Sequence, residues 1–217
     1  MNNARAAFVG VFGSQIALVG MEHGTGEFLQ GRTRPRSMVI RSWPDSGFFR
    51  ILDGEPAFTV IPDMGLAGIA TLLVCLALLV YVWRFRRSMR VGLGILALSG
   101  LLFLTGGGFG PPFLGLILGL AVSVPAARAR ETLPAWRVRL RKTLAETWPL
   151  PLAGCVVSFL VLMPGLPLLD HLGGIDDPAL VVAAFLSAMT FLAWTIASVR
   201  ARDAGCGARS PLKEVGG

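Results

Sequence analysis

The chain alternates between long apolar blocks and short charged segments, a pattern typical of proteins that cross a membrane several times. A transmembrane helix needs about 20 apolar residues, and each block is long enough for one crossing or slightly shorter. We therefore expect an all-α polytopic membrane protein that is a bundle of six helices. The predicted spans are residues 6–21, 64–83, 91–105, 113–127, 150–169 and 179–199.

The third and fourth spans come from one stretch, residues 91–127, that contains no charged residue. Arginines flank both of its ends, and a single broken helix would place them on opposite sides of the membrane. A short central helical hairpin keeps them on one side, as the preference of Lys and Arg for the cytoplasm requires. Each arm has 15 residues and rises only ~22 Å as a helix, less than the hydrocarbon core. The segment predicted to join the arms is Gly106, Gly107, Gly108, Phe109, Gly110, Pro111 and Pro112.

Three polar segments complete the expected organisation. Residues 22–63 form an exterior loop with a small β-hairpin at 48–61, turning at Asp53 and Gly54. Residues 132–148 carry apolar side chains at helical spacing between basic ones, which predicts an amphipathic helix on the inner leaflet. We expect a single membrane domain over 1–202 and a disordered cytoplasmic tail over 203–217. The residues expected to contact anionic lipid headgroups are Trp136, Arg137, Arg141 and Lys142.

The net charge of +7 is informative because of where the charged residues lie along the chain. Basic residues lie beside the apolar blocks, which indicates contact with the lipid bilayer and not with nucleic acid. Only five of the 20 Lys and Arg fall in the 22–63 loop, and the turns 106–112 and 170–178 have none. This asymmetry predicts that both termini are cytoplasmic, in the plasma (inner) membrane of a prokaryotic cell.

Candidate chemistry is sparse. The 106–112 segment is the leading candidate for contacting a substrate, because glycine amides before a helix N-terminus can bind an anion, although a tight turn whose glycines let the helices pack closely is the favoured explanation. Weak metal candidates are His23, near Glu22 and Glu27, together with His171 and Asp170, and their spacing matches no ligand motif. No ionisable residue lies clearly inside a predicted span, so the sequence gives no catalytic set and no cofactor.

Two function classes follow from these observations. The first is a non-enzymatic scaffold or partner-binding membrane protein, which would hold another membrane or envelope protein through the 22–63 loop and the amphipathic helix. The alternative is a small transporter or channel that uses the 106–112 helix break. We expect the protein not to be an enzyme.

Overall fold

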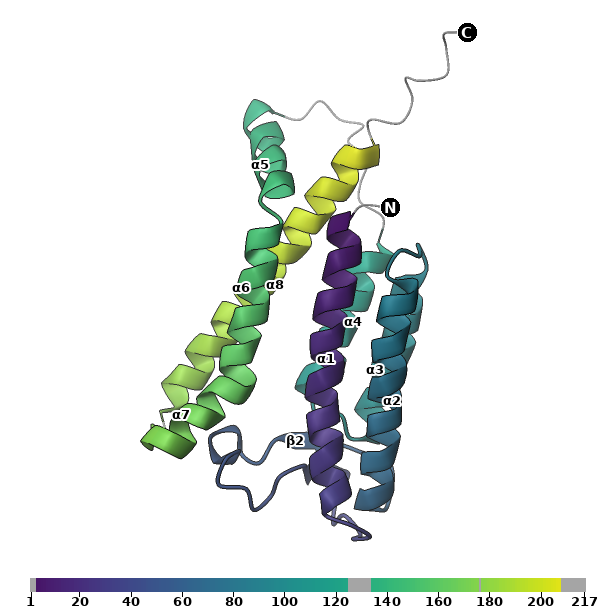
Figure 1. The fold of residues 1–217 in the computed structure, drawn as a ribbon, viewed down its shortest axis with the longest axis vertical. Helices are drawn as coiled ribbons and strands as arrows, with labels where there is room; N and C mark the ends of the chain where they lie inside the picture. Colours follow the sequence, from purple (N-terminus) through teal and green to yellow (C-terminus); the bar gives the residue numbers. More distant parts are fainter. Residues whose placement is uncertain (1–2, 125–133, 176, 208–217) are drawn as a thin grey trace.

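The computed structural model describes residues 3–124, 134–175 and 177–207, which are mostly helical (Figure 1). A two-stranded antiparallel sheet is the only sheet among them. In chain order the elements are α1 (Asn3–Leu29), β1 (Val39–Arg41), η1 (Arg50–Leu52), β2 (Pro56–Phe58), α2 (Met64–Phe85), α3 (Val91–Thr105), α4 (Gly110–Ser123), α5 (Ala135–Glu146), α6 (Pro149–Leu160), η2 (Val161–Gly165), α7 (Leu166–Gly173) and α8 (Pro178–Gly207).

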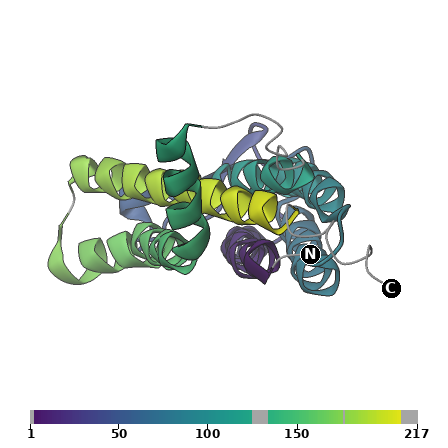
Figure 2. The same ribbon diagram turned by 90° about the horizontal axis from the view of Figure 1, so that it is seen from above.

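Helix α1 is the central element of the bundle. It packs against α2 and α4 on one side and against α6 and α8 on the other, while α3 lies between α2 and α4. Figure 2 shows α1 between these two groups of helices. The side chains of Phe8, Phe12 and Ile16 on α1 are almost fully buried and form the middle of the hydrophobic core. Both groups are therefore held together through one helix.

Four helices are long and apolar enough to cross a membrane: α1, α2, the continuous helix Pro149–Gly173 and residues Pro178–Ala204 of α8. Helices α3 and α4 are apolar but shorter. Large apolar side chains point outward along the bundle, as Leu73, Val80 and Val182 do. An outward apolar surface of this extent belongs in lipid, so the fold is that of a multi-pass membrane protein.

Helices α3 and α4 pack side by side as the two arms of the uncharged stretch. Helix α3 has the predicted bounds, and α4 begins three residues earlier than predicted, at Gly110. The predicted end at 127 lies outside the described residues. Small residues allow the close approach, because a Cβ on Gly119 would lie 2.7 Å from Leu96 Cγ. Gly119 in α4 therefore allows α3 and α4 to pack closely against each other within the chain.

The first span was predicted too short. Helix α1 continues eight residues past position 21, so Glu22, His23 and Glu27 are helical and do not lie in a loop. Glycines let this last part of α1 approach α2, since a Cβ on Gly24 would lie 3.1 Å from the carbonyl oxygen of Gly68. Tertiary contact therefore extends the helix beyond its apolar block.

The predicted hairpin at 48–61 is wrong in its pairing. Strand β2 pairs with β1, in the register Val39 with Phe58, and residues 50–52 form a 3₁₀ turn. The aromatic ring of Phe49 stacks on Trp43 with centroids 5.2 Å apart, which folds this segment back instead of extending it. The turn predicted at Asp53 and Gly54 is present, and both residues have positive φ.

The remaining helices differ from their predicted bounds at the ends. The fifth span continues to Gly173, with Pro164 inside the π-helical turn η2. Helix α8 continues through Gly207, so 203–207 are helical, and 208–217 lie outside the described residues. Helix α5 covers most of the predicted amphipathic segment and packs against α8, where Arg202 Nη1 donates to the carbonyl of Ala145 at 2.9 Å.

The connections at one end of the bundle are bound to each other. The loop after α1, the α3–α4 turn and the end of α7 all lie at this end, which we call the loop end, while α5 and the start of α1 lie at the other (Figure 1). Val60 N donates to the carbonyl of Leu104 at 3.0 Å, so the loop is bonded to the end of α3. The loop thereby covers this end of the bundle.

Candidate functional site

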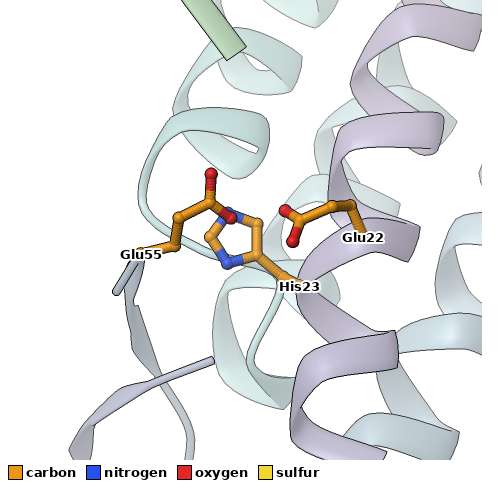
Figure 3. Close-up of side chains that lie close together, drawn as sticks. All are labelled: Glu22, His23 and Glu55. Carbon is orange, nitrogen blue, oxygen red and sulfur yellow. The ribbon is translucent and has the colours of Figure 1, made fainter. Parts of the chain in front are cut away.

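Polar side chains are buried where α1 meets the loop. Helix α1 supplies Glu22, His23 and Glu27, and the loop supplies Ser42 and Glu55. Glu27 is fully buried, and His23 and Glu55 are only 4% and 3% exposed. Figure 3 shows the side chains of Glu22, His23 and Glu55 gathered together, with both carboxyl groups close to the His23 ring.

Glu27 has partners for both carboxylate oxygens. The hydroxyl groups of Ser42 and Thr71 each donate to it at 3.4 Å. The α3–α4 turn closes over this carboxylate at Gly106, where φ is 122° and a Cβ would overlap both oxygens. Glycine is needed at 106 for both reasons. These contacts hold Glu27 in place at the buried side of the cluster.

The hydrogen bonds around His23 select one tautomer of its ring. Its Nδ1 lies 3.0 Å from Ser42 Oγ, whose hydroxyl proton is directed to Glu27. With Ser42 donating to Glu27, the tautomer that carries its proton on Nδ1 allows His23 to donate to Ser42 Oγ. The unprotonated Nε2 faces Glu55 Oε2 at 3.5 Å. His23 consequently presents a lone pair toward the carboxyl groups.

Glu22 and Glu55 bring oxygens that have no such partners. Glu22 Oε1 accepts from Trp43 Nε1. Within the described part of the chain, Glu22 Oε2 and both oxygens of Glu55 are buried without a hydrogen-bond partner when both acids are ionised. Burial, a side-chain hydrogen bond to the Glu22 carboxyl and the charge of that carboxyl raise the pKa of Glu55 to about 10, so at neutral pH Glu55 holds a proton, which lies between the two acids. A buried carboxyl without partners is costly, so this group needs a proton or a ligand.

The backbone holds Glu55 in an unusual conformation. Its φ is 55°, in the left-handed region that non-glycine residues rarely adopt. The carbonyl of Glu55 accepts from Ser42 N at 3.1 Å, and its own N–H donates to Leu52 at 3.0 Å. The loop therefore fixes a strained residue with its side chain inside the cluster, and such strain gathers at functional sites.

A cavity of about 470 Å³ adjoins the cluster, and its lining is almost entirely apolar. His23 and Glu55 lie in its wall, together with apolar side chains from α1, α4, α6 and α8. Phe113, Ile117 and Phe185 also line it and are exposed on the outer surface. The cavity therefore connects the buried polar cluster with the surface that faces lipid.

The 106–112 segment lies directly against this site. Phe109, Gly110 and Pro111 line the cavity, and a Cβ on Gly108 would overlap His23 Nε2. The amides of Gly107 and Gly108 donate to backbone carbonyls at 3.0 and 2.8 Å, so they are not open to an anion. The glycines thus contribute by leaving room for His23 and Glu27.

The other sequence-predicted residues lie elsewhere. Asp170 pairs with Arg50 at 2.5 Å, and the exposed His171 ring lies 5.9 Å from that of Phe48, so neither joins the His23 cluster. Trp136, Arg137, Arg141 and Lys142 are on α5 at the opposite end, where the Arg137 guanidinium lies 5.1 Å over the Trp136 ring. Their contact with lipid headgroups stays a prediction.

Sequence reasoning missed Glu55. Its signal was weak, because an acid beside an Asp-Gly turn is ordinarily a solvated turn residue. A better signal was available on α1, where His23 and Glu27 are four residues apart between glycines and share one helix face.

No family model matches the chain, and searches of curated proteins and of solved structures also give no match. Function must therefore be inferred from the geometry of the cluster and its cavity.

Proposed function

We propose that the protein binds a lipid-like amphiphile within the membrane, with the apolar chain in the cavity and the headgroup at Glu22, His23 and Glu55. One observation carries this proposal: a largely apolar cavity that reaches the lipid-facing surface has buried, unpartnered carboxyl oxygens in its wall. Its volume of about 470 Å³ falls within the range of small-molecule sites.

We further propose six membrane crossings with both termini in the cytoplasm of a prokaryotic cell. The arrangement at the loop end supports this, because it gathers the three connections expected outside. The arginines after α2 and the basic helix α5 belong to the opposite end, as the positive-inside rule requires. The cluster then lies near the exterior leaflet, within reach of lipid from that leaflet.

The chemistry of the cluster restricts the headgroup. One oxygen of Glu22 and both oxygens of Glu55 lack donors, so a hydroxyl or amine group would satisfy them and remove the cost of burying them alone. The apolar lining contributes affinity through the acyl chain, since each buried methylene is worth about 0.8 kcal/mol. An amphiphile with a hydrogen-bond-donating headgroup fits both parts of the site.

The test uses phosphatidylethanolamine with a diazirine in its acyl chain, in nanodiscs that contain the full chain. After illumination, mass spectrometry locates the labelled residues. We expect label on Phe12 and Ile16, which line the cavity and are shielded from bulk lipid, besides label on outward residues such as Leu73. Label on outward residues alone would contradict the proposal.

A matched pair of variants on α8 separates cavity binding from surface contact. Met189 lines the cavity, whereas Leu186 is exposed and is not part of the lining. Met189→Trp should fill part of the cavity and reduce labelling of Phe12 and Ile16 several-fold. Leu186→Trp should leave that labelling unchanged, and equal effects of the two substitutions would count against a cavity site.

Transport of the same amphiphile is a second candidate, because Phe109, Gly110 and Pro111 of the predicted helix break line the cavity. Movement of a fluorescent phosphatidylethanolamine between leaflets of reconstituted vesicles would favour transport, and labelling without such movement would favour binding alone. The partner-binding role expected from the sequence stays a prediction, to be tested by pull-down with and without residues 32–62.

A further inference from the structure

Three side chains with metal-binding atoms converge beside the cavity, and two of them, His23 and Glu55, line it. One atom from each of Glu22, His23 and Glu55 can be chosen so that all three lie within 4.8 Å of one another. They come from consecutive positions on α1 and from the strained loop residue (Figure 3). Zinc holds its ligands at ~2.0–2.2 Å, so these side chains would have to close around the ion.

We propose that Glu22, His23 and Glu55 bind a divalent transition-metal ion of the zinc type. One imidazole and two carboxylates match zinc better than magnesium or calcium, which prefer oxygen ligands alone. The unpartnered, buried oxygens of Glu55 are the observation that points to an ion, because a cation supplies the charge and the bonds that they lack.

The groups behind the three ligands are arranged as metal sites require. A metal-ligating histidine normally donates its other ring N–H to an acceptor that fixes the tautomer. Here Nδ1 donates to Ser42, which in turn donates to Glu27, and Nε2 is left with a free lone pair. Trp43 Nε1 holds one oxygen of Glu22 and leaves the other to the ion. Both ligands are oriented before any ion binds.

Three protein ligands leave a fourth position of a tetrahedral ion open, as in catalytic zinc sites. His23 and Glu55 line the cavity, so this position faces the space assigned above to the amphiphile. The metal site deepens the proposed function by placing a Lewis acid at the headgroup, but binding of the ion itself does not depend on an amphiphile. A headgroup oxygen or a water molecule would complete the coordination.

The experiment measures zinc binding by the full chain in detergent, purified without a polyhistidine tag and stripped with a chelator. Equilibrium dialysis against Zn²⁺, followed by elemental analysis, gives the stoichiometry and the affinity. We expect one tightly bound Zn²⁺ per chain and a rise in the unfolding temperature when Zn²⁺ is added. The proposal would be overturned if the unmodified chain bound no more zinc than the variants described below.

Three variants identify the ligands. Loss of an outer hydrogen-bonding partner already weakens metal sites about 10–100-fold, so His23→Ala and Glu55→Gln should raise the zinc Kd by at least about a hundredfold. His171→Ala removes the other histidine, which is exposed and outside the cluster, and should leave the Kd unchanged. An equal loss in His171→Ala would assign the zinc to surface histidines and refute the site.

Failure of this proposal can be told apart from failure of amphiphile binding. Zinc binding is measured without the photoreactive lipid, and lipid labelling is measured in the presence of the chelator. Labelling of Phe12 and Ile16 without zinc binding would leave the cavity function standing and refute the metal site. Zinc binding without such labelling would establish the metal site and refute the amphiphile. Glu55→Gly, which relaxes the strained backbone, provides a folded protein without the ligand if Glu55→Gln misfolds.

Discussion

Two buried carboxylates, Asp170 and Glu55, lie in opposite surroundings at the loop end of the bundle. The side chain of Asp170 is 1% exposed, and its Oδ1 lies 2.5 Å from Arg50 Nη2, so a charged donor compensates its burial. Glu55 is 3% exposed and neither of its oxygens accepts a hydrogen bond within the described part of the chain. Asp170 therefore binds the loop to α7 through Arg50. Glu55 has no such donor in the described part of the chain, so we expect it to bind a ligand.

Burial of charge is therefore not what distinguishes a site in this molecule. Arg5, near the start of α1, is also buried, yet its guanidinium donates to the carbonyl of Val122 at 2.5 Å and lies 3.4 Å from Met89 Sδ. Glu27 has hydroxyl donors on both oxygens. In each of these cases another part of the chain provides a hydrogen-bond or ionic partner, so a structural role explains why the charged side chain is buried. Among the charged side chains buried in the described part of the chain, those of the cluster around Glu55 have oxygens without a partner, whereas the other unpartnered buried atoms belong to the neutral residues Gln15, Ser99, Ser123 and Ser198.

The sharpest way to break the comparison is to replace each acid by its amide in turn. Glu55→Gln should raise the zinc Kd by at least about a hundredfold with little change in stability. Asp170→Asn should lower the free energy of unfolding by about 1–2 kcal/mol, because Arg50 loses its ionic partner, and leave zinc binding unchanged. Chelator competition measures the zinc Kd, and unfolding in sodium dodecyl sulfate measures the free energy of unfolding. Parallel changes in both variants would remove the distinction.

The glycines of the α3–α4 turn offer a second contrast. Gly108 has a φ of 76° and faces His23, so Gly108→Ala should cost about 2 kcal/mol and weaken zinc binding. Gly110 has open space where a Cβ would lie, and Gly110→Ala should change stability by less than about 0.5 kcal/mol. Thermal unfolding followed by circular dichroism compares them. If Gly108→Ala is as mild as Gly110→Ala, the turn does not shape the site.

Arg5 should behave as a structural residue. Arg5→Ala removes the donor to Val122 and should lower the free energy of unfolding by about 1.5 kcal/mol. Zinc binding per folded molecule should not change, because Arg5 lies at the other end of α1. Arg87→Ala, at an exposed arginine of the same end, is the control and should be nearly neutral. A zinc affinity that falls in Arg5→Ala would contradict the separation of the two ends.

The smallest expected effect concerns the strain at Glu55. Glycine tolerates a φ of 55°, whereas alanine does not, so Glu55→Gly should be more stable than Glu55→Ala by about 1 kcal/mol. Neither variant should bind zinc in the cluster. Unfolding curves of both proteins under the same conditions provide the comparison, and equal stabilities would show that this conformation stores no strain.

Much of the helical framework could be predicted from the sequence, because each helix follows from local composition. Helix α3 has its predicted bounds, and α2 differs from its prediction by two residues at one end. Asp63 caps α2, with Oδ1 accepting from Leu66 N at 2.9 Å. These features depend on neighbouring residues alone.

The site could not be predicted in the same way, because its parts meet only after folding. Helix α1 extends past its apolar block since the loop covers Glu22 and His23, and the pairing of β1 with β2 brings Glu55 opposite them. A prediction that pairs residues 48–52 with 57–61 places Glu55 in a solvated turn. Hydrophobic periodicity identifies the helices of this protein, whereas long-range pairing of the loop decides where its chemistry lies.

X-ray absorption at the zinc edge tests the central claim most directly, namely that the leftover polar atoms at the end of α1 bind a ligand. The proposed site predicts four nitrogen or oxygen ligands at about 2.0–2.2 Å, with the scattering signature of a single imidazole. That signature should be absent from His23→Ala and preserved in His171→Ala. Sulfur ligands, two or more imidazoles, or a spectrum that His23→Ala does not change would contradict the assignment.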